Sequence, residues 1–376
     1  MKISIEDYSD PSTVLLDRAA IEALTQGKII DAPITRLKRN PDLWLLPTAM
    51  QQNGDVFLSH TVVRGDLDKL ESSEFCIVNE HKLFEVPEHL ADQNNGRHWI
   101  TNLLHLEDGV LAFLHSEYTG QNDYFGMEAS LIDDVETRAP GRSSIGLAWL
   151  SQEDLDADRI RFTYLGHIAT YSAGFPHFNV SGTPVLVNEV DGTEYVNILF
   201  MDSQGEEEEG GWRKDDAFVT QARAPLADVV DHAKQGSVSP WRKRDKKGWS
   251  DAMGSSSRAV LPRAPGHPDK RIREGDVIVH SDLMRDPKSG RFVLLAYVLK
   301  RKKRNPSSIV FYSSEDGVKW QFEGTTHERD DGEAGWSYAS FFDVDAEDSN
   351  PYVLIGWDYG KPGRCVYKLG VEIDAS

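Results

Sequence analysis

Short apolar segments of strand character recur five times along the chain, each shortly after a turn rich in Gly, Asp, Asn or Ser. The segments are residues 56–60, 111–115, 196–200, 293–297 and 353–357. The turns are residues 53–55, 107–109, 191–193, 288–290 and 349–351. Turn residues between apolar runs indicate antiparallel strands. Strand units that return at intervals of roughly 50 to 100 residues are typical of a β-propeller, whose first strands line one central funnel.

A further apolar strand follows each of these segments, and two units carry a candidate fourth strand. The further strands are residues 73–78, 144–149, 217–222, 308–312 and 364–369, and the candidate fourth strands are 161–165 and 320–323. We therefore predict an all-β fold, a five-bladed β-propeller. Six blades are the alternative if residues 1–40 or 235–275 contain another blade.

The repeats continue without a linker, which predicts a single domain of residues 1–376. The blades are expected at roughly 42–90, 97–170, 177–250, 276–328 and 335–373. The fifth repeat ends soon after its third strand, whereas the strand-like segment 27–38 has no obvious partner. We expect this segment to pair into the last blade, because closing the ring removes an exposed edge strand.

Two kinds of segment interrupt the strand pattern. Residues 225–234 are predicted to form a short helix that ends at Gly236. Residues 119–142 and 235–275 are long insertions rich in Gly, Pro, Ser and charged residues. Loops on a rigid scaffold are where function concentrates, so these insertions are expected to shape a site.

Composition narrows the functional classes. The chain has 376 residues and a net charge of −20, which argues against general nucleic-acid binding, since that needs clustered Lys and Arg. No apolar run reaches the length of a membrane span, and the N-terminus lacks the pattern of a secretory signal. We therefore expect a cytoplasmic protein with no membrane partner, or a secreted one if its leader was trimmed. Cys76 and Cys365 give neither a disulfide framework nor a metal spacing.

Several segments resemble parts of known carbohydrate-active propellers. Residues 313–320, Ser-Ser-Glu-Asp-Gly-Val-Lys-Trp, are similar to a turn that recurs in five-bladed propeller glycoside hydrolases. Residues 280–292 resemble the inner strand and Asp-Pro-x-x-Gly turn of those enzymes. Residues 114–117 with 143–148, and residues 221–226, are also similar to their blades. The chain thus resembles glycoside hydrolase family 43 and its relatives, the arabinanase, xylosidase and invertase group.

The resemblance implies hydrolysis of glycosidic bonds in an oligosaccharide, by paired carboxylates in the central funnel. Glycoside hydrolysis requires one carboxyl group as acid and a second as base or nucleophile. The family's first blade usually carries an acidic residue near its opening, and residues 44–50 contain none. Blade one therefore does not supply the expected carboxylate.

Asp282 and Glu117 are the predicted catalytic residues. Asp282 follows His280 at an inner strand and precedes an apolar one, and Glu117 ends a strand just before the 119–142 insertion. A carboxyl group beside an apolar strand is suited to general acid catalysis, because a low-polarity environment favours its protonated form. We expect both side chains to face the funnel as an acid–base pair.

Substrate binding is predicted for residues near the inner strands and their approaches: Trp44, Arg97, His98, Trp99, His115, His177, His280, Trp336 and Tyr338. Aromatic faces stack on sugar rings, and an arginine pairs with the carboxylate of an acidic sugar. No cofactor is expected to be required, although the histidines could hold Ca²⁺ or another divalent ion in the central channel.

Two other functions remain open. A polysaccharide lyase on a similar propeller would use His, Tyr and Arg to remove a proton beside a uronate carboxyl group, and His98, His115, His280, Arg97 and Tyr338 fit those roles. A non-catalytic propeller that binds a glycan or a protein would need none of the acids. An unsaturated, ultraviolet-absorbing product separates lyase from hydrolase, and turnover separates both from a binding module.

Overall fold

The computed structural model describes residues 2–6, 10–26, 29–30, 32–52, 55–90, 97–117, 143–170, 183–204, 207–208, 211–212, 216–253, 257–262, 277–299, 307–328, 335–344, 351–358 and 365–374. The chain divides into two compact units, Met1–Ile77 with Val260–Ser376, and Val78–Ala259. No helix among the described residues is long and apolar enough to cross a membrane.

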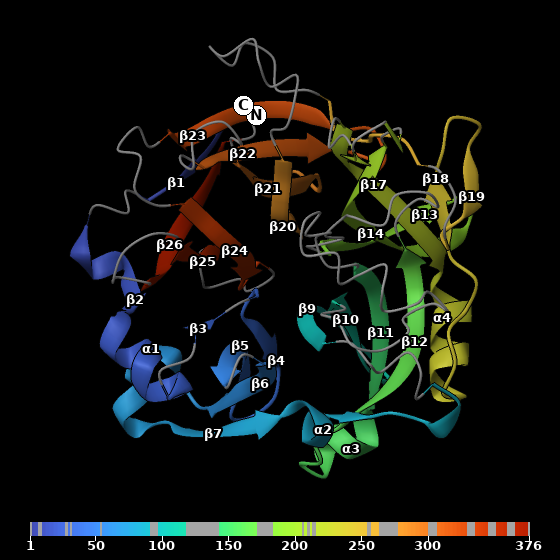
Figure 1. Ribbon diagram of the computed structural model, residues 1–376. Coiled ribbons are helices and arrows are strands. Elements are labelled where there is room, and N and C mark those ends of the chain that lie inside the picture. The colour runs from blue at the N-terminus through green and yellow to red at the C-terminus, as the bar shows by residue number, and fades with distance from the viewer. Residues whose placement is uncertain are drawn as a thin grey trace. The chain divides into compact units, whose positions relative to one another are not determined.

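Three antiparallel sheets lie mainly in the first unit (Figure 1). One has the order β3-β5-β6-β7, with β4 beside β5: β3 Ile29–Ile30, β4 Thr35–Leu37, β5 Leu43–Gln52, β6 Asp55–Arg64 and β7 Glu74–Asn79. The next has the order β20-β21-β22-β23: Val277–Arg285, Phe292–Leu299, Ser307–Ser314 and Gln321–Glu328. The last has the order β1-β26-β25-β24, with β2 beside β26: β1 Lys2–Ile5, β2 Val14–Leu16, β24 Gly335–Phe342, β25 Tyr352–Asp358 and β26 Cys365–Asp374.

Two five-stranded sheets lie in the second unit. The first has the order β8-β12-β11-β10-β9: β8 Phe84–Glu85, β9 Arg97–Leu106, β10 Gly109–Glu117, β11 Ser143–Ser151 and β12 Phe162–Thr170. The second has the order β13-β14-β17-β18-β19: β13 Val185–Val190, β14 Thr193–Gln204, β17 Asp216–Pro225, β18 Arg242–Arg244 and β19 Trp249–Asp251. A separate hairpin joins β15 Glu207–Glu208 to β16 Gly211–Trp212.

The described helices are short and connect or cover strands. They are η1 Pro11–Thr13, α1 Arg18–Thr25, η2 Leu67–Ser72, α2 Glu80–Leu83, α3 Gln152–Asp156 and α4 Leu226–Lys234. Helix α4 confirms the helix predicted at 225–234, and Gly236 after it has a φ of 73°, the left-handed conformation that glycine adopts readily. The five large sheets are the blades of a five-bladed β-propeller, as predicted.

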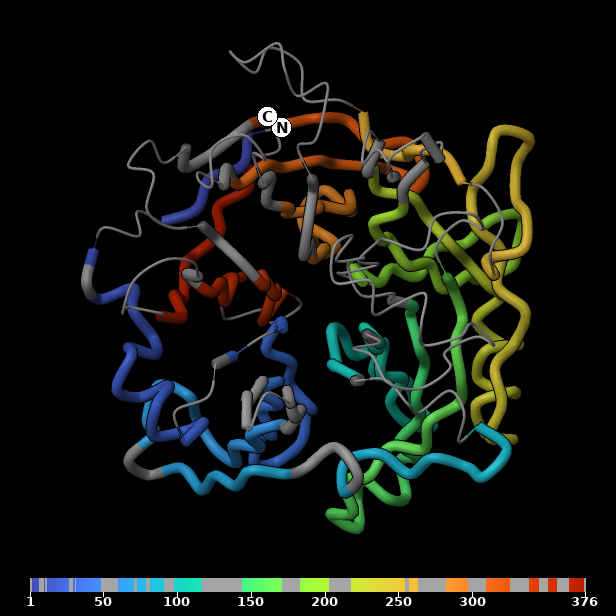
Figure 2. Tube along the Cα trace, viewed as in Figure 1, coloured from blue at the N-terminus to red at the C-terminus, as the bar shows by residue number. Residues whose placement is uncertain are grey.

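An N-terminal strand completes the last blade, as predicted, but it is β1 and not the segment 27–38. Within the segment 27–38, the described strands β3 and β4 both pair with β5 of the first blade. Strands β1 and β2 pair with β26 instead, so the two ends of the chain lie side by side (Figure 2). The segment 27–38 is close in sequence to β5, and a short connection costs little loop-closure entropy. Pairing with the nearby β5 is therefore favoured over pairing with the last blade, which is distant in sequence.

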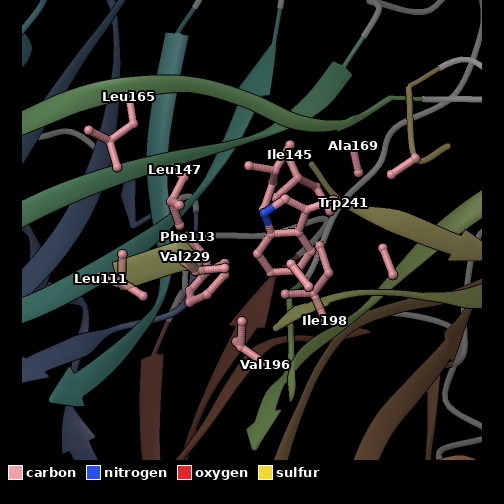
Figure 3. Packing of buried hydrophobic residues seen from close by; sticks show 14 of the residues in the cluster. Leu111, Phe113, Ile145, Leu147, Leu165, Ala169, Val196, Ile198, Val229 and Trp241 are labelled. Atoms are coloured by element: carbon pink, nitrogen blue, oxygen red, sulfur yellow. The ribbon is translucent and has the colours of Figure 1, made fainter. Parts of the chain in front are cut away.

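The second unit has a core between its two sheets. Its members come from β10, β11, β12, β14, β17 and α4, and Figure 3 shows the Trp241 indole among Phe113, Ile145 and Ile198. The ring centroids of Phe113 and Trp241 are 6.3 Å apart at 80°, an edge-to-face arrangement that stabilises aromatic pairs. This packing fixes one face of each sheet.

The turn at residues 313–320 is held by its own side chains. Asp316 Oδ1 accepts the backbone N–H groups of Val318 and Lys319 at 2.8 and 2.7 Å. The Ser314 hydroxyl accepts the Gly317 N–H at 2.9 Å and donates to the Lys319 carbonyl at 2.7 Å. These hydrogen bonds satisfy backbone groups within the turn itself. The segment that resembles a turn of glycoside hydrolases therefore has an architectural role here.

Candidate active site

Two first strands of the first unit, β20 and β24, are interrupted by β-bulges. Pairing of β20 with β21 shifts between Val279 and Asp282, and pairing of β24 with β25 shifts between Ser337 and Ser340. Tyr338 lies inside the second bulge with a φ of 59°, a left-handed conformation that is rare for a bulky residue. Bulges and left-handed non-glycine residues concentrate at functional sites, where they redirect side chains.

The Asp282 carboxylate joins these two bulged strands. The side chain is buried, with 8% of its surface exposed. Oδ1 accepts the N–H of Leu283 at 2.8 Å, and Oδ2 accepts the N–H of Phe341 in β24, also at 2.8 Å. Hydrogen bonds from two backbone N–H donors stabilise the negatively charged form of a carboxylate. Asp282 is therefore a buried, well-oriented carboxyl group that links β20 to β24.

Three other predicted residues lie on the same two strands. His280 is within the β20 bulge, and Trp336 pairs in register with Trp357. The structure describes only the backbone of these two residues, whereas the Tyr338 side chain is half-buried. His280 is therefore two residues from Asp282 on β20, and Trp336 and Tyr338 lie on β24, whose Phe341 donates to Asp282. Their contact with a substrate stays a prediction.

Trp44 occupies a different environment in the first unit. It belongs to a buried apolar cluster, and its Nε1 donates to the Gly65 carbonyl at 3.0 Å. Its ring centroid is 5.1 Å from that of Phe342, and the Arg36 Cζ lies 5.2 Å from it. A tryptophan with these contacts packs the blade and presents little surface, so substrate binding by Trp44 stays an untested prediction.

In the second unit, β9 and β10 place six predicted or neighbouring residues in cross-strand pairs. Arg97 is opposite Glu117, His98 is opposite Ser116, and Trp99 is opposite His115. The side chains of Arg97 and Glu117 are outside the described part of the structure. The roles predicted for Arg97 and Glu117 stay predictions.

His98 is fully buried and hydrogen-bonded. Its Nδ1 lies 2.7 Å from the Ser116 Oγ, and its ring centroid is 4.7 Å from that of Tyr164. Burial, together with the neighbouring His167 and His115, lowers the pKa of His98 to about 3. The imidazole is therefore neutral at pH 7 and fixed by packing, which suits an orienting role better than a proton-transfer role.

A second serine–histidine pair completes this polar cluster, and sequence reasoning missed it. Ser144 Oγ lies 2.7 Å from the His167 Nδ1, and burial lowers the pKa of His167 to about 3. Ser144 is opposite Ser116 in register, so both pairs share one face of the sheet. Gly146 permits the close packing, because a Cβ there would lie 3.2 Å from Ser116 Oγ. His167 is a polar residue inside the apolar strand 162–170, and this position was the sequence signal that could have revealed the pair.

The other face of this sheet carries Trp99 and His115. Their ring centroids are 5.4 Å apart at 36°, and the two side chains are 4% and 6% exposed. The predicted residue His177 lies outside the described residues. Among those that are described, no group of three or more His, Cys, Asp or Glu is arranged to hold a metal ion, and the divalent ion stays a prediction.

The buried histidines predict how stability depends on pH. Burial lowers the pKa of His60, His98 and His167 from 6.5 to about 3. Between these values the unfolded chain binds protons that the folded chain does not, so the free energy of unfolding falls as the pH drops below about 6.5. Each histidine contributes about 1.4 kcal/mol per pH unit. Denaturant titrations from pH 7 to pH 4 measure this slope.

Substitution of two histidines isolates their share of that slope. In a variant with His98→Gln and His167→Gln, the amides can still bond to the serines, and two titrating groups are gone. We expect the slope to decrease by about 3 kcal/mol per pH unit. A pH dependence parallel to that of the wild type would show that these histidines are not neutral in the folded chain.

Comparison with known proteins defines the fold. No family model matches the sequence, and a search of curated proteins gives no match. Among solved structures, the chain is similar to a mutant α-L-arabinanase from Cellvibrio cellulosa, with a TM-score of 0.52, 10% identity and 93% of both chains covered. It is also similar to the catalytic domain of a GH62 α-L-arabinofuranosidase from Coprinopsis cinerea, with a TM-score of 0.43, 12% identity, and 98% of this chain and 96% of that one covered.

A GH43_1 enzyme from Xanthomonas citri is similar with a TM-score of 0.44, 11% identity, and 96% of this chain and 94% of that one covered. At 10% identity, the similarity to the arabinanase shows the fold alone. The chain shares the propeller fold of the arabinanase.

Proposed function

We propose that the chain is a glycoside hydrolase that cleaves an oligosaccharide. The observation that carries the proposal is the buried Asp282 carboxylate, held by two backbone N–H groups where β20 and β24 both bulge. The propeller fold shared with an arabinanase supports it. A buried, oriented carboxylate on a first strand is the group that hydrolysis of a glycosidic bond requires.

The environment of Asp282 supports a role as the anionic partner in the reaction. Two backbone N–H donors stabilise the charged carboxylate, so Asp282 is suited to activate water or to attack the sugar, rather than to donate a proton. The proton donor would be Glu117, as the sequence predicts. We propose that His280, Trp336 and Tyr338 contribute to sugar binding near Asp282.

The lyase alternative is less well supported. A lyase base should have a pKa near the working pH, because it must both accept and release the proton. His98 was a candidate for that role, but its pKa of about 3 makes it a weak base at neutral pH. The same argument applies to His167. Because these two histidines are weak bases at neutral pH, they support a lyase less well than hydrolysis by carboxylates.

A substrate screen tests the proposal. The protein is incubated with a panel of pentose, hexose and uronate oligosaccharides, and new reducing ends and ultraviolet absorbance are measured together. Hydrolysis is expected to release reducing ends without ultraviolet absorbance. New ends that appear in step with absorbance would instead identify a lyase, and binding without either signal would identify a non-catalytic glycan-binding propeller.

A further inference from the structure

Three arginines gather on one face of the outer strands in the second unit. Arg223 of β17 is opposite Arg242 of β18, and Arg244 of β18 is opposite Trp249 of β19. Residues that face each other in register point to the same side of a sheet, as do residues two apart on a strand. The three guanidinium groups therefore share this face. Lys243, between two of them, points to the opposite side.

On the opposite side of the sheet, the charge of Lys243 is balanced by a carboxylate. Lys243 is fully buried there, with its Nζ 3.2 Å from the Asp202 Oδ2. Ser257 Oγ donates to the same oxygen at 2.5 Å. The buried lysine thus has a carboxylate partner, as the cost of burying a charge requires.

Two aromatic rings hold Arg223. Its Cζ lies 4.2 Å from the ring centroid of Tyr195 and 4.1 Å from that of Trp249, and the Arg244 Cζ lies 5.3 Å from Trp249. Cation–π contacts use the flat face of a guanidinium, which leaves the N–H donors at its edge available. We name Tyr195, Arg223, Arg242, Arg244 and Trp249 the arginine–aromatic patch.

Register places one acidic residue, Asp251, beside the arginines of the patch. Within the described residues, the contacts found for the guanidinium groups of Arg223 and Arg244 are those with Tyr195 and Trp249. Asp251 is opposite Arg242 in register, and its Oδ1 accepts the Met253 N–H. Burial, and then the positive charges of Arg244 and Arg242, lower the pKa of Arg223. Three arginines beside one carboxylate are a local excess of positive charge in a chain of net charge −20.

We propose that the arginine–aromatic patch is a surface site that binds the carboxylates of an acidic polysaccharide. Guanidinium edges match carboxylates in a bidentate geometry, and the aromatic rings fix the orientation of Arg223 in advance. Arg242 is exposed, and the other four members are partly exposed, so a polymer can reach them. This function is additional to the proposed hydrolysis, because the patch contains no carboxylate that could act on a glycosidic bond.

A nucleic acid suits the patch less well than a carboxylated sugar chain. Base stacking needs open aromatic faces, whereas Arg223 already covers a face of both Tyr195 and Trp249. A nucleic-acid site also tracks many phosphates, and the net charge of −20 opposes so dense a polyanion beyond the patch. The sugar chain needs only a few carboxylates in the right positions.

The test uses one polymer with and without its charge. Binding of the full chain to polygalacturonate and to its methyl ester is measured without turnover, so the result does not depend on hydrolysis. We expect the wild type to bind polygalacturonate and not the ester, with affinity that falls as salt is added. Binding to neither polymer, equal binding to both, or displacement of polygalacturonate by an equal mass of single-stranded DNA would overturn the proposal.

Variants locate the binding on the surface. Arg242→Gln changes an exposed side chain and is expected to weaken binding about tenfold, and the triple variant Arg223→Gln, Arg242→Gln, Arg244→Gln about a hundredfold or more. The control variant Lys2→Gln, Lys288→Gln, Lys319→Gln removes the same charge from exposed positions in the first unit. Affinity lost equally in the control and triple variants, or unchanged in Arg242→Gln, would contradict the assignment.

Discussion

Asp282→Asn is expected to lower kcat for oligosaccharide hydrolysis by about 10²- to 10⁴-fold, the contribution typical of one catalytic acid or base. The substitution removes the negative charge and keeps the size of the side chain. Its amide also brings an N–H₂ group toward one of the two backbone donors, Leu283 or Phe341. Some stability is therefore lost as well, about 1–3 kcal/mol for an unsatisfied buried group. Steady-state kinetics and denaturant unfolding separate the two effects.

Asp286 provides the matched control for this experiment. It is also buried, at 3% exposure, and accepts the backbone N–H groups of Ser289 and Lys288 at 3.0 and 3.3 Å in the turn after β20. Asp286→Asn should lower stability by a similar amount and leave kcat unchanged. If both variants lose activity only in proportion to the unfolded fraction, Asp282 is a structural link between strands and not a catalytic group.

Glu117→Gln tests the second predicted carboxyl group independently. We expect kcat to fall by about 10²-fold or more. The pH–rate profile should lose the limb that reports the proton donor. Ser116→Ala, at the adjacent position, is the control because it removes the Ser116–His98 hydrogen bond and keeps the carboxyl group. Wild-type activity in Glu117→Gln would exclude this residue as the acid.

Deletion of residues 1–16 is expected to destabilise the last blade strongly. The deletion removes β1 and β2, both of which pair with β26, and with them the fully buried Leu16 and the 8% exposed Ile5. Loss of a large buried aliphatic side chain costs about 2–5 kcal/mol, so the two together approach the stability of a typical domain. Thermal unfolding and hydrogen exchange measure the effect.

The pattern of exchange identifies the closing strands. In the truncated chain, amides of β26 that bond to β1 should exchange much faster, whereas amides of β5 should keep their protection. The double variant Ile29→Ala, Ile30→Ala disturbs β3 and should affect β5 instead, because β3 pairs with that strand. A truncated chain that melts like the full-length one would show that β1 and β2 do not complete the blade.

Local features of the fold could be read from the sequence because the physics that determines them is local. The turn at 107–109 and the apolar segment after it predict the β9–β10 hairpin, and Gly236 marks the end of α4. The closing strand was assigned wrongly because Lys2–Ile5 is short and its partner β26 lies at the other end of the chain. The outer strands β18 and β19 lie within the 235–275 segment that was expected to be a loop insertion.

The candidate site was predictable only in part. Asp282 was recognisable because an acidic residue among strand residues is unusual. Its hydrogen bond to Phe341 was not, because it depends on the packing of two strands whose bonded residues are 59 positions apart. The left-handed Tyr338 follows from the bulge in β24, which no single residue type signals. Likewise, the Ser144–His167 pair depends on strand register. These features arise from tertiary structure, which overrides local preference.

The central claim is that this propeller hydrolyses glycosidic bonds, and the most direct measurement follows the oxygen of water. The best substrate from the oligosaccharide panel is incubated with the protein in ¹⁸O-labelled water, and the products are analysed by mass spectrometry. Hydrolysis predicts one labelled oxygen at the new reducing end of each cleaved chain, and no label when Asp282→Asn replaces the wild type. Unlabelled, unsaturated products, or no cleavage of any oligosaccharide in the panel, would contradict the account.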